Sequence, residues 1–196
     1  MKATNSIRTA LTLLTTLTLA LSVPALAANL HLTNGDLLGF KFDSWQGGHR
    51  VPFIARWPGK IRAGSVSDHL VCQLDLLATF AALTGSDASA PDSVNMLPVL
   101  TGTPSTSVRR ELVITPQQKT HIAFRHDEWI YIGARGGGGF AGAKPGDHGP
   151  GGPAALKLSG EVNSDIVDGK FVPGAPEEQL DDLGSDPGQK KNVIGL

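Results

Sequence analysis

The chain has 196 residues, of which 17 are lysine or arginine and 18 are aspartate or glutamate, giving a formal net charge of −1. A balance this close to neutral does not favour binding to nucleic acid or to an anionic membrane surface. The single cysteine, Cys72, excludes an internal disulfide, and its position in an apolar run predicts a small buried side chain.

The first 27 residues have the three parts of a secretory signal peptide. Lys2 and Arg8 form a basic region, residues 10–23 are apolar but rich in threonine, and Ala25-Leu26-Ala27 is an A-x-A cleavage site. The apolar run is shorter than the roughly 20 residues that a spanning helix needs. We therefore expect a mature chain that begins at Ala28, has no membrane span and is exported to the periplasm or the medium.

The run GFKFDSWQGGHRVPFIARWPGKI, residues 39–61, combines turn residues with a short apolar stretch. Gly47 and Gly48 would allow positive φ at a sharp turn, and Pro52 pushes the residue before it toward extended geometry. Residues 51–57 are mostly apolar and end at a Pro-Gly turn signal. The pattern predicts a strand over 51–57.

Lys41 precedes this predicted strand by one loop. A rigid scaffold there could hold its ammonium against an anion, because a fixed cation stabilises negative charge that develops in a transition state. The alternative is a solvated surface lysine without a function.

Further along the chain, residues 71–85 have apolar side chains at helical spacing, with Asp75 as a cap and Gly85 as a stop. Short apolar segments predict strands over 112–115, 121–124 and 129–132.

A tract rich in glycine and proline follows, over residues 133–152. It has almost no large apolar side chain to offset the entropy of ordering, which predicts a mobile loop. We interpret Asp147 and His148 within it as a solvated pair and not as a metal or acid–base site.

These motifs resemble the arylsulfatase-type sulfatases, which are formylglycine-dependent members of the alkaline-phosphatase-like superfamily. The family pattern reads G-x-K, four residues, E-G-G-x-R-V-P, a short apolar strand and W-P-G. Residues in register with it are Lys41, Gly47, Gly48, Arg50, Val51, Pro52, Trp57, Pro58 and Gly59. Near the end, QLDDLGSDPGQKKNV is similar to the terminal signature E-L-Y-D-L-x-x-D-P-x-E-x-x-N-L, although Asp181 replaces the tyrosine. Gln46 departs from the glutamate beside the double glycine.

The resemblance implies an α/β chain. It would comprise the end of a sulfatase catalytic domain over residues 28–132, the Gly/Pro-rich loop 133–152 and a C-terminal tail over 153–196. The tail and the preceding strands would form a smaller subdomain with a short antiparallel sheet and a packed helix.

The resemblance also assigns chemistry. It makes Lys41 a catalytic, sulfate-contacting residue and places His49 and Arg50 as further substrate-binding residues. Family members also carry a C-x-P-x-R or S-x-P-x-R signature that supplies the formylglycine nucleophile, and aspartates that bind a calcium-type ion. Here Cys72 is followed by Gln-Leu-Asp-Leu, and the upstream aspartate motif is missing. We therefore expect no cofactor and no metal ligand in this chain.

Three functions remain open at this point. The chain could be the C-terminal portion of a sulfuric ester hydrolase acting on sulfated polysaccharide or aryl sulfate, partnered by an N-terminal half. It could be a secreted, non-catalytic module that binds sulfated glycans. It could also be an inactive gene fragment.

Overall fold

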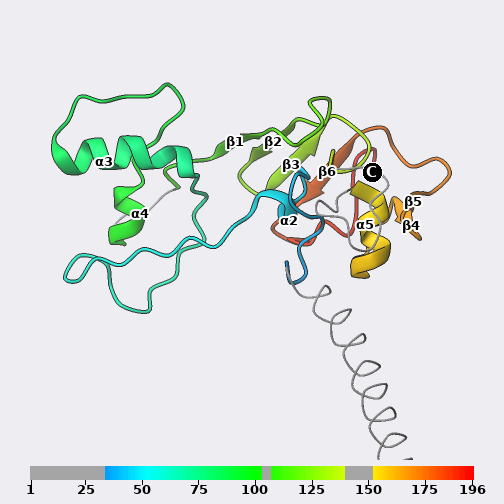
Figure 1. Ribbon diagram of the computed structural model, residues 1–196, viewed down its shortest axis with the longest axis horizontal. Helices are drawn as coiled ribbons and strands as arrows, with labels where there is room; N and C mark the ends of the chain where they lie inside the picture. Colours follow the sequence, from blue (N-terminus) through cyan, green and yellow to red (C-terminus); the bar gives the residue numbers. More distant parts are fainter. Residues whose placement is uncertain (1–33, 103–106, 140–151) are drawn as a thin grey trace, which may run out of the picture.

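The computed structural model describes residues 34–102, 107–139 and 152–196, so the signal peptide and the Asp147–His148 pair lie outside the described residues. It combines short helices with a small antiparallel sheet. Figure 1 shows the sheet at one end of the molecule, with α2 and α5 beside it, and helices α3 and α4 at the other end.

Four antiparallel strands in the order β1-β2-β3-β6 form the main sheet. Their bounds are β1 Glu111–Ile114, β2 Ala123–His126, β3 Trp129–Ile132 and β6 Gln179–Asp182. The first three confirm the strands predicted near these positions, with β2 shifted by two residues. Strand β6 was not predicted as a strand, because only its resemblance to a terminal motif was visible in the sequence.

One face of the sheet is buried and the other is exposed. Residues alternate along each strand, so that Ile114, Ala123 and Ile132 form one buried row across β1, β2 and β3. Trp45 and Leu38 from the segment before the sheet pack on this face, as does Leu156 of α5 (Gly152–Ser159). A small hairpin closes the core with β4 (Ile166–Val167) and β5 (Lys170–Phe171).

We call residues 51–102 the arm. It carries the short helix η1 (Gln73–Asp75), α3 (Leu76–Thr84) and α4 (Leu97–Thr101). The helix predicted over 71–85 is confirmed, and Gly85 ends α3 with φ 67°. Asp75 caps the turn before α3, since its carboxylate accepts a hydrogen bond from the backbone N–H of Cys72 at 2.9 Å.

The strand predicted over residues 51–57 is wrong. This segment has no helix or strand structure, and within the described residues it pairs with no strand. Its large side chains face solvent, with Ile54 90% exposed and Val51 60% exposed. The apolar run and the turn after it predicted a strand, but a strand forms only where a neighbouring strand supplies hydrogen-bond partners. In the described parts of the chain, no helix is both long and apolar enough to cross a bilayer.

Candidate functional site

Lys41 lies on an exposed turn at the edge of the core. The N–H of Asp43 donates to the carbonyl of Phe40 at 2.9 Å, which closes the turn. The Lys41 ammonium lies 4.7 Å from the centroid of the Phe42 ring, a cation–π distance. The turn therefore presents a cation to solvent from a backbone anchored next to the core.

Phe42 has a left-handed backbone with φ 83°. A bulky residue in this region carries strain on the order of 1–3 kcal/mol, and such strain persists only where the surroundings hold it. Here the Gln117 N–H donates to the Phe42 carbonyl at 3.0 Å, and the Asp43 side chain accepts from the Phe40 N–H at 2.9 Å. Strain stored directly beside Lys41 is consistent with a functional turn.

The double glycine does not have the role predicted for it. Gly47 and Gly48 lie in the short helix α2 (Gln46–His49), and neither has positive φ. A Cβ at Gly47 would lie 2.2 Å from the carbonyl oxygen of Gly39, and one at Gly48 would lie 2.2 Å from that of Asp43. These two positions need glycine because the helix packs directly on the backbone of the Lys41 turn.

Asp43 joins the Lys41 turn to two parts of the glycine tract, at Gly139 and at Gly152. Its buried carboxylate accepts hydrogen bonds from the backbone N–H groups of Phe40, of Gly139 at 2.8 Å and of Gly152 at 3.1 Å. Burial raises the pKa of Asp43, although these hydrogen bonds oppose the rise.

The first part of the glycine tract is therefore not a mobile loop. Residues 136–139 are buried, and the carbonyl of Gly137 accepts from the Ser44 N–H at 2.6 Å. A Cβ at Gly137 would lie 2.7 Å from Asp43 Oδ1. The prediction considered only apolar side chains, but the backbone of glycine residues can also pack against a buried carboxylate. Residues 140–151 of the tract lie outside the described part.

His49 and Arg50, at the end of α2, form a basic cluster with a third residue that the sequence analysis did not single out, Arg125 of β2. The Arg125 side chain is only 16% exposed, its Nε donates to the Asp127 carbonyl at 2.7 Å, and its Nη2 lies 4.0 Å from Glu128. Burial lowers the pKa of His49 to about 4, and the charges of Arg125 and Arg50 contribute to the shift. At neutral pH the cluster therefore holds two guanidinium charges and a neutral imidazole. In the sequence, the spacing A-x-R-x-x-x-W over residues 123–129 is the signal that could have pointed to Arg125.

A buried network of glutamines joins α2 to the C-terminal segment. The Gln46 N–H donates to Gln189 Oε1 at 2.7 Å, and Gln189 Nε2 donates to Asp181 Oδ2 at 2.9 Å. Beside it, Trp45 Nε1 donates to Gln179 Oε1 at 2.9 Å. Asp181 and the backbone of Gln46, two positions that depart from the family pattern, are therefore joined through Gln189.

Asp181 makes this network sensitive to pH. Its pKa is raised to about 7, mainly by burial; the neighbouring carboxylates of Asp186 and Asp165 contribute to the rise, and the hydrogen bond from Gln189 opposes it. Because the folded-state pKa lies above the unfolded one, stability from this group is complete below about pH 4 and is lost as pH rises toward 7.

Replacing Asp181 with asparagine should therefore stabilise the protein at pH 8. The amide can still accept from Gln189 but carries no buried charge, so we expect a gain of about 1–3 kcal/mol in the free energy of unfolding at pH 8. The gain should disappear at about pH 3.5. Urea unfolding at both pH values measures it, with Asp87→Asn at an exposed loop as the control; a loss of stability at pH 8 would contradict the argument.

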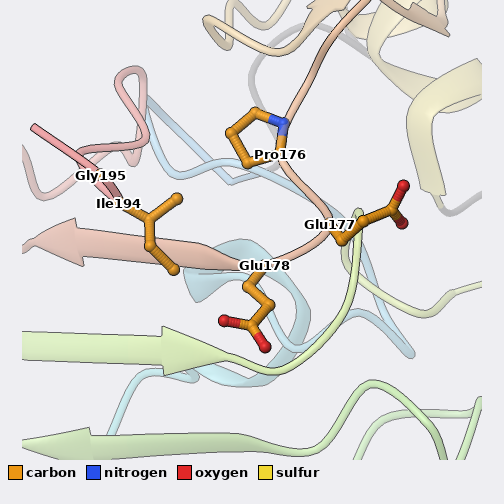
Figure 2. A pocket seen from close by; sticks show the side chains of 5 residues that line it. All are labelled: Pro176, Glu177, Glu178, Ile194 and Gly195. Atoms are coloured by element: carbon orange, nitrogen blue, oxygen red, sulfur yellow. The ribbon is translucent and has the colours of Figure 1, made fainter.

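Two surface pockets accompany these features, and neither is lined by Lys41, His49 or Arg50. The larger, of about 350 Å³, lies between the C-terminus and the approach to β6. Figure 2 shows the carboxylates of Glu177 and Glu178 pointing away from each other there, and Glu177 pairs with Arg135 at 2.5 Å. The smaller pocket, of about 110 Å³, includes Arg109 and Arg125.

The described residues do not fit the two groups that sulfatase chemistry uses. Among them, no set of three or more histidine, cysteine, aspartate or glutamate side chains is arranged to hold a metal ion. Cys72 is half-buried, and the residues after it, Gln-Leu-Asp-Leu, lack the proline and arginine of the formylglycine signature.

Comparison with known proteins agrees with the motifs. A sulfatase family model matches residues 24–86. The N-acetylgalactosamine-6-O-sulfatase of Bacteroides thetaiotaomicron is 34% identical over 107 residues, which are 53% of this chain and 20% of that protein. The human N-acetylgalactosamine-6-sulfatase is 43% identical over 72 residues, which are 35% of this chain and 14% of that protein.

A solved structure agrees over a longer range. It comes from work on the metabolism of multiple glycosaminoglycans by Bacteroides thetaiotaomicron, is 29% identical, and superposes with a TM-score of 0.56. The match covers 81% of this chain but only 28% of the other. Over the part that these matches cover, the chain is similar to the sulfatases, and it spans a minor fraction of the length of these relatives.

Proposed function

We propose that this chain is the C-terminal portion of a sulfuric ester hydrolase that acts on sulfated polysaccharide or aryl sulfate. In this proposal residues 28–132 end the catalytic domain, and residues 153–196 complete a C-terminal subdomain with the antiparallel sheet and α5. The protein is secreted or periplasmic after cleavage of its signal peptide. The observation that carries the proposal is the Lys41 turn, whose sequence matches the sulfatase motif and whose strained backbone is held by Asp43.

The role of Lys41 is electrostatic. An ammonium held beside the ester stabilises the negative charge that develops on the sulfate oxygens in the transition state. The guanidinium groups of Arg50 and Arg125 add positive potential that attracts an anionic substrate. His49 contributes as a neutral hydrogen-bonding group, since its pKa of about 4 leaves it uncharged at neutral pH. The nucleophile and the metal ligands come from a separate part of the sulfatase.

The test is a complementation assay. The chain is combined with an N-terminal sulfatase segment that carries the nucleophile and metal ligands, and turnover of a chromogenic sulfate ester is measured. Lys41→Ala should lower turnover by a factor on the order of 10² to 10³, as for loss of one charge-stabilising group. Lys170→Ala, an exposed lysine on β5, is the matched control and should leave the rate unchanged. An unchanged rate in Lys41→Ala would remove Lys41 from the site, and the chain alone should show no turnover.

A second candidate is a non-catalytic module that binds sulfated glycans. The exposed cations at Lys41 and Arg50 favour it, together with the absence of a nucleophile signature around Cys72. Binding of the chain alone to chondroitin 6-sulfate, weakened by salt and absent for the desulfated polymer, would support this reading. Hydrolysis that depends on the complementing segment would instead support the first.

A further inference from the structure

Asp181 is a buried carboxylate without a cationic partner. It lies in β6 and is 1% exposed, and its Oδ2 accepts a hydrogen bond from Gln189 Nε2 at 2.9 Å. Among the residues that the structure describes, no salt bridge reaches Asp181. A buried carboxylate without a cation is costly to ionise, so Asp181 keeps its proton to a higher pH than an exposed aspartate does.

Two further carboxylates face Asp181. Asp165 precedes β4 and Asp186 lies in the turn after β6, and their charges contribute to raising the pKa of Asp181, after burial as the main cause. Both are held in place. Asp165 Oδ2 accepts from Asn192 Nδ2 at 2.8 Å, and Asp186 Oδ2 accepts from the Lys191 N–H at 2.9 Å. An ionised Asp181 would therefore face two other carboxylates at fixed positions.

The cations on the buried side of the sheet do not pair with Asp181. The register places Ile130 of β3 next to Asp181 and Arg125 of β2 beyond Ile130. Neighbouring strands are about 4.8 Å apart, so Arg125 lies about 10 Å from Asp181, two strands away. On α2, the pKa of about 4 leaves His49 uncharged at neutral pH, and Arg50 is exposed.

The amide of Gln189 connects Asp181 to α2. This side chain is fully buried, and its Oε1 accepts from the Gln46 N–H at 2.7 Å while its Nε2 donates to Asp181. An amide accepts only through its oxygen and donates only through its nitrogen, so the two contacts require one orientation of the group. A rearrangement at Asp181 that turns this amide also removes the acceptor of the Gln46 N–H.

Gln46 is the first residue of α2, and the other anchor at this end of the helix also comes from β6. Trp45, which precedes α2, donates through its indole nitrogen to Gln179 at the start of β6. The helix has only four residues, and His49 and Arg50 lie at its end. The position of these two basic residues therefore depends on the attachment of α2 to β6 and to Gln189.

We propose that Asp181, Gln189 and Gln46 form a pH-sensitive link between α2 and the C-terminal segment 183–196, closed when Asp181 is protonated and opened when Asp181 ionises. In the closed state, neutral Asp181 accepts from Gln189, and Gln189 holds Gln46. When Asp181 releases its proton to solvent, the buried charge favours an open state in which water reaches the carboxylate and the Gln189 amide can turn away from α2. The link rests on these contacts and does not depend on the proposed function.

The direction of the pH effect is fixed by proton linkage. The pKa of Asp181 is about 7 in the closed state, and water that reaches the open state returns it toward the usual aspartate value of about 3.9. A group whose pKa is higher in the closed state stabilises that state in acid and loses this effect as pH rises toward 7. Opening therefore becomes more frequent between about pH 4 and pH 7 and then changes little.

Hydrogen exchange of the Gln46 amide in the ¹⁵N-labelled full chain tests the link. The protection factor, which corrects for the intrinsic effect of pH on exchange, should fall by about 10-fold or more from pH 5 to pH 8. Asp181→Asn should remove this fall, because the amide carries no charge at either pH. Asp182→Asn is the matched control at the next residue of β6 and should keep the fall, since Asp182 bonds to Gly184 and Ser185 and not to Gln189.

A carboxyl ¹³C titration of the unsubstituted chain tests the same link without any variant. Asp181 should titrate with a midpoint near 7. A midpoint near 4 would overturn the proposal, and so would a Gln46 protection factor that is constant with pH or that still falls in Asp181→Asn. An equal fall at the amides of β2 and β3 would also overturn it, because Asp181 would then act on global unfolding and not on α2. None of these measurements uses sulfate ester turnover, so a failure of the proposed function would leave the link intact.

Discussion

Arg109→Ala is expected to release the arm from the sheet and to unfold α3 while the sheet stays folded. Arg109 precedes β1, and its Nε donates to Asp75 Oδ2 at 2.9 Å, while a second hydrogen bond joins its Nη2 to Asp75 Oδ1. It also donates to the Asp92 carbonyl at 2.6 Å. The side chain of Asp75 is 1% exposed and that of Arg109 is 10% exposed, so alanine would leave a buried carboxylate without its cation. Breaking a buried pair in this way costs about 3–5 kcal/mol.

The stability that Asp75 contributes depends on pH, because of its pairing with Arg109. Burial alone would raise the pKa of Asp75, but hydrogen bonds from Arg109 and from the backbone N–H groups of Val94 and Cys72 lower it. Because the folded-state pKa lies below the unfolded one, the stability from this group is present at neutral pH. It is lost as pH falls through the folded-state pKa, below the usual aspartate range.

Hydrogen exchange measures the effect of Arg109→Ala region by region. Amides of α3 should lose protection, and those of β3 should keep it. Arg110→Ala is the matched control at the next residue, because Arg110 pairs with Asp127 on the surface and its side chain is 62% exposed. Surface pairs of this kind contribute little, so no change is expected there. Equal loss of protection in β3 and α3 would show that the arm and the sheet unfold as one unit.

Asp43→Ala is expected to be the most destabilising change around the Lys41 turn. It would leave the N–H groups of Phe40, Gly139 and Gly152 without their acceptor in a buried site. Each buried unsatisfied donor costs about 1–3 kcal/mol, and part of this is offset because a buried charge is also removed. We expect a net loss of about 3–5 kcal/mol in the free energy of unfolding.

Urea unfolding at pH 7 measures this loss, with Ser44→Ala as the neighbouring control. The Ser44 hydroxyl donates to the Gly137 carbonyl at 3.0 Å, but the Ser44 backbone N–H also donates there, so the control should lose only about 1 kcal/mol. Asp43→Asn should be intermediate, since the amide keeps one acceptor oxygen for the three donors. A cost for Asp43→Ala no larger than for Ser44→Ala would show that water or local rearrangement satisfies the three N–H groups.

Local pattern predicted the elements whose neighbours are close in the sequence. The strands β1, β2 and β3 follow one another, so alternation and turn residues were sufficient to place them. The helix α3 was placed by its apolar spacing and by Gly85. In each case the hydrogen-bond partners lie within the element or in the next one along the chain.

Contacts between distant segments could not be predicted in this way. The segment 51–57 has the composition of a strand but lacks a partner within the described residues. Gly47 and Gly48 are required by the backbone of Gly39 and Asp43, and not by their own φ. The carboxylate of Asp43 orders residues 136–139, which composition alone assigned to a mobile loop.

The sequence by itself determined the resemblance to sulfatases, the candidate residues Lys41, His49 and Arg50, and the three consecutive strands, because these depend on residue identity and on local spacing. Only the tertiary structure decided that Arg125 joins the basic cluster, that Asp43 holds the strained turn of Lys41, and that the arm is left uncovered. These three features depend on which distant groups come together in space, because the energetic effect of a buried, charged or unpaired group is set by its neighbours.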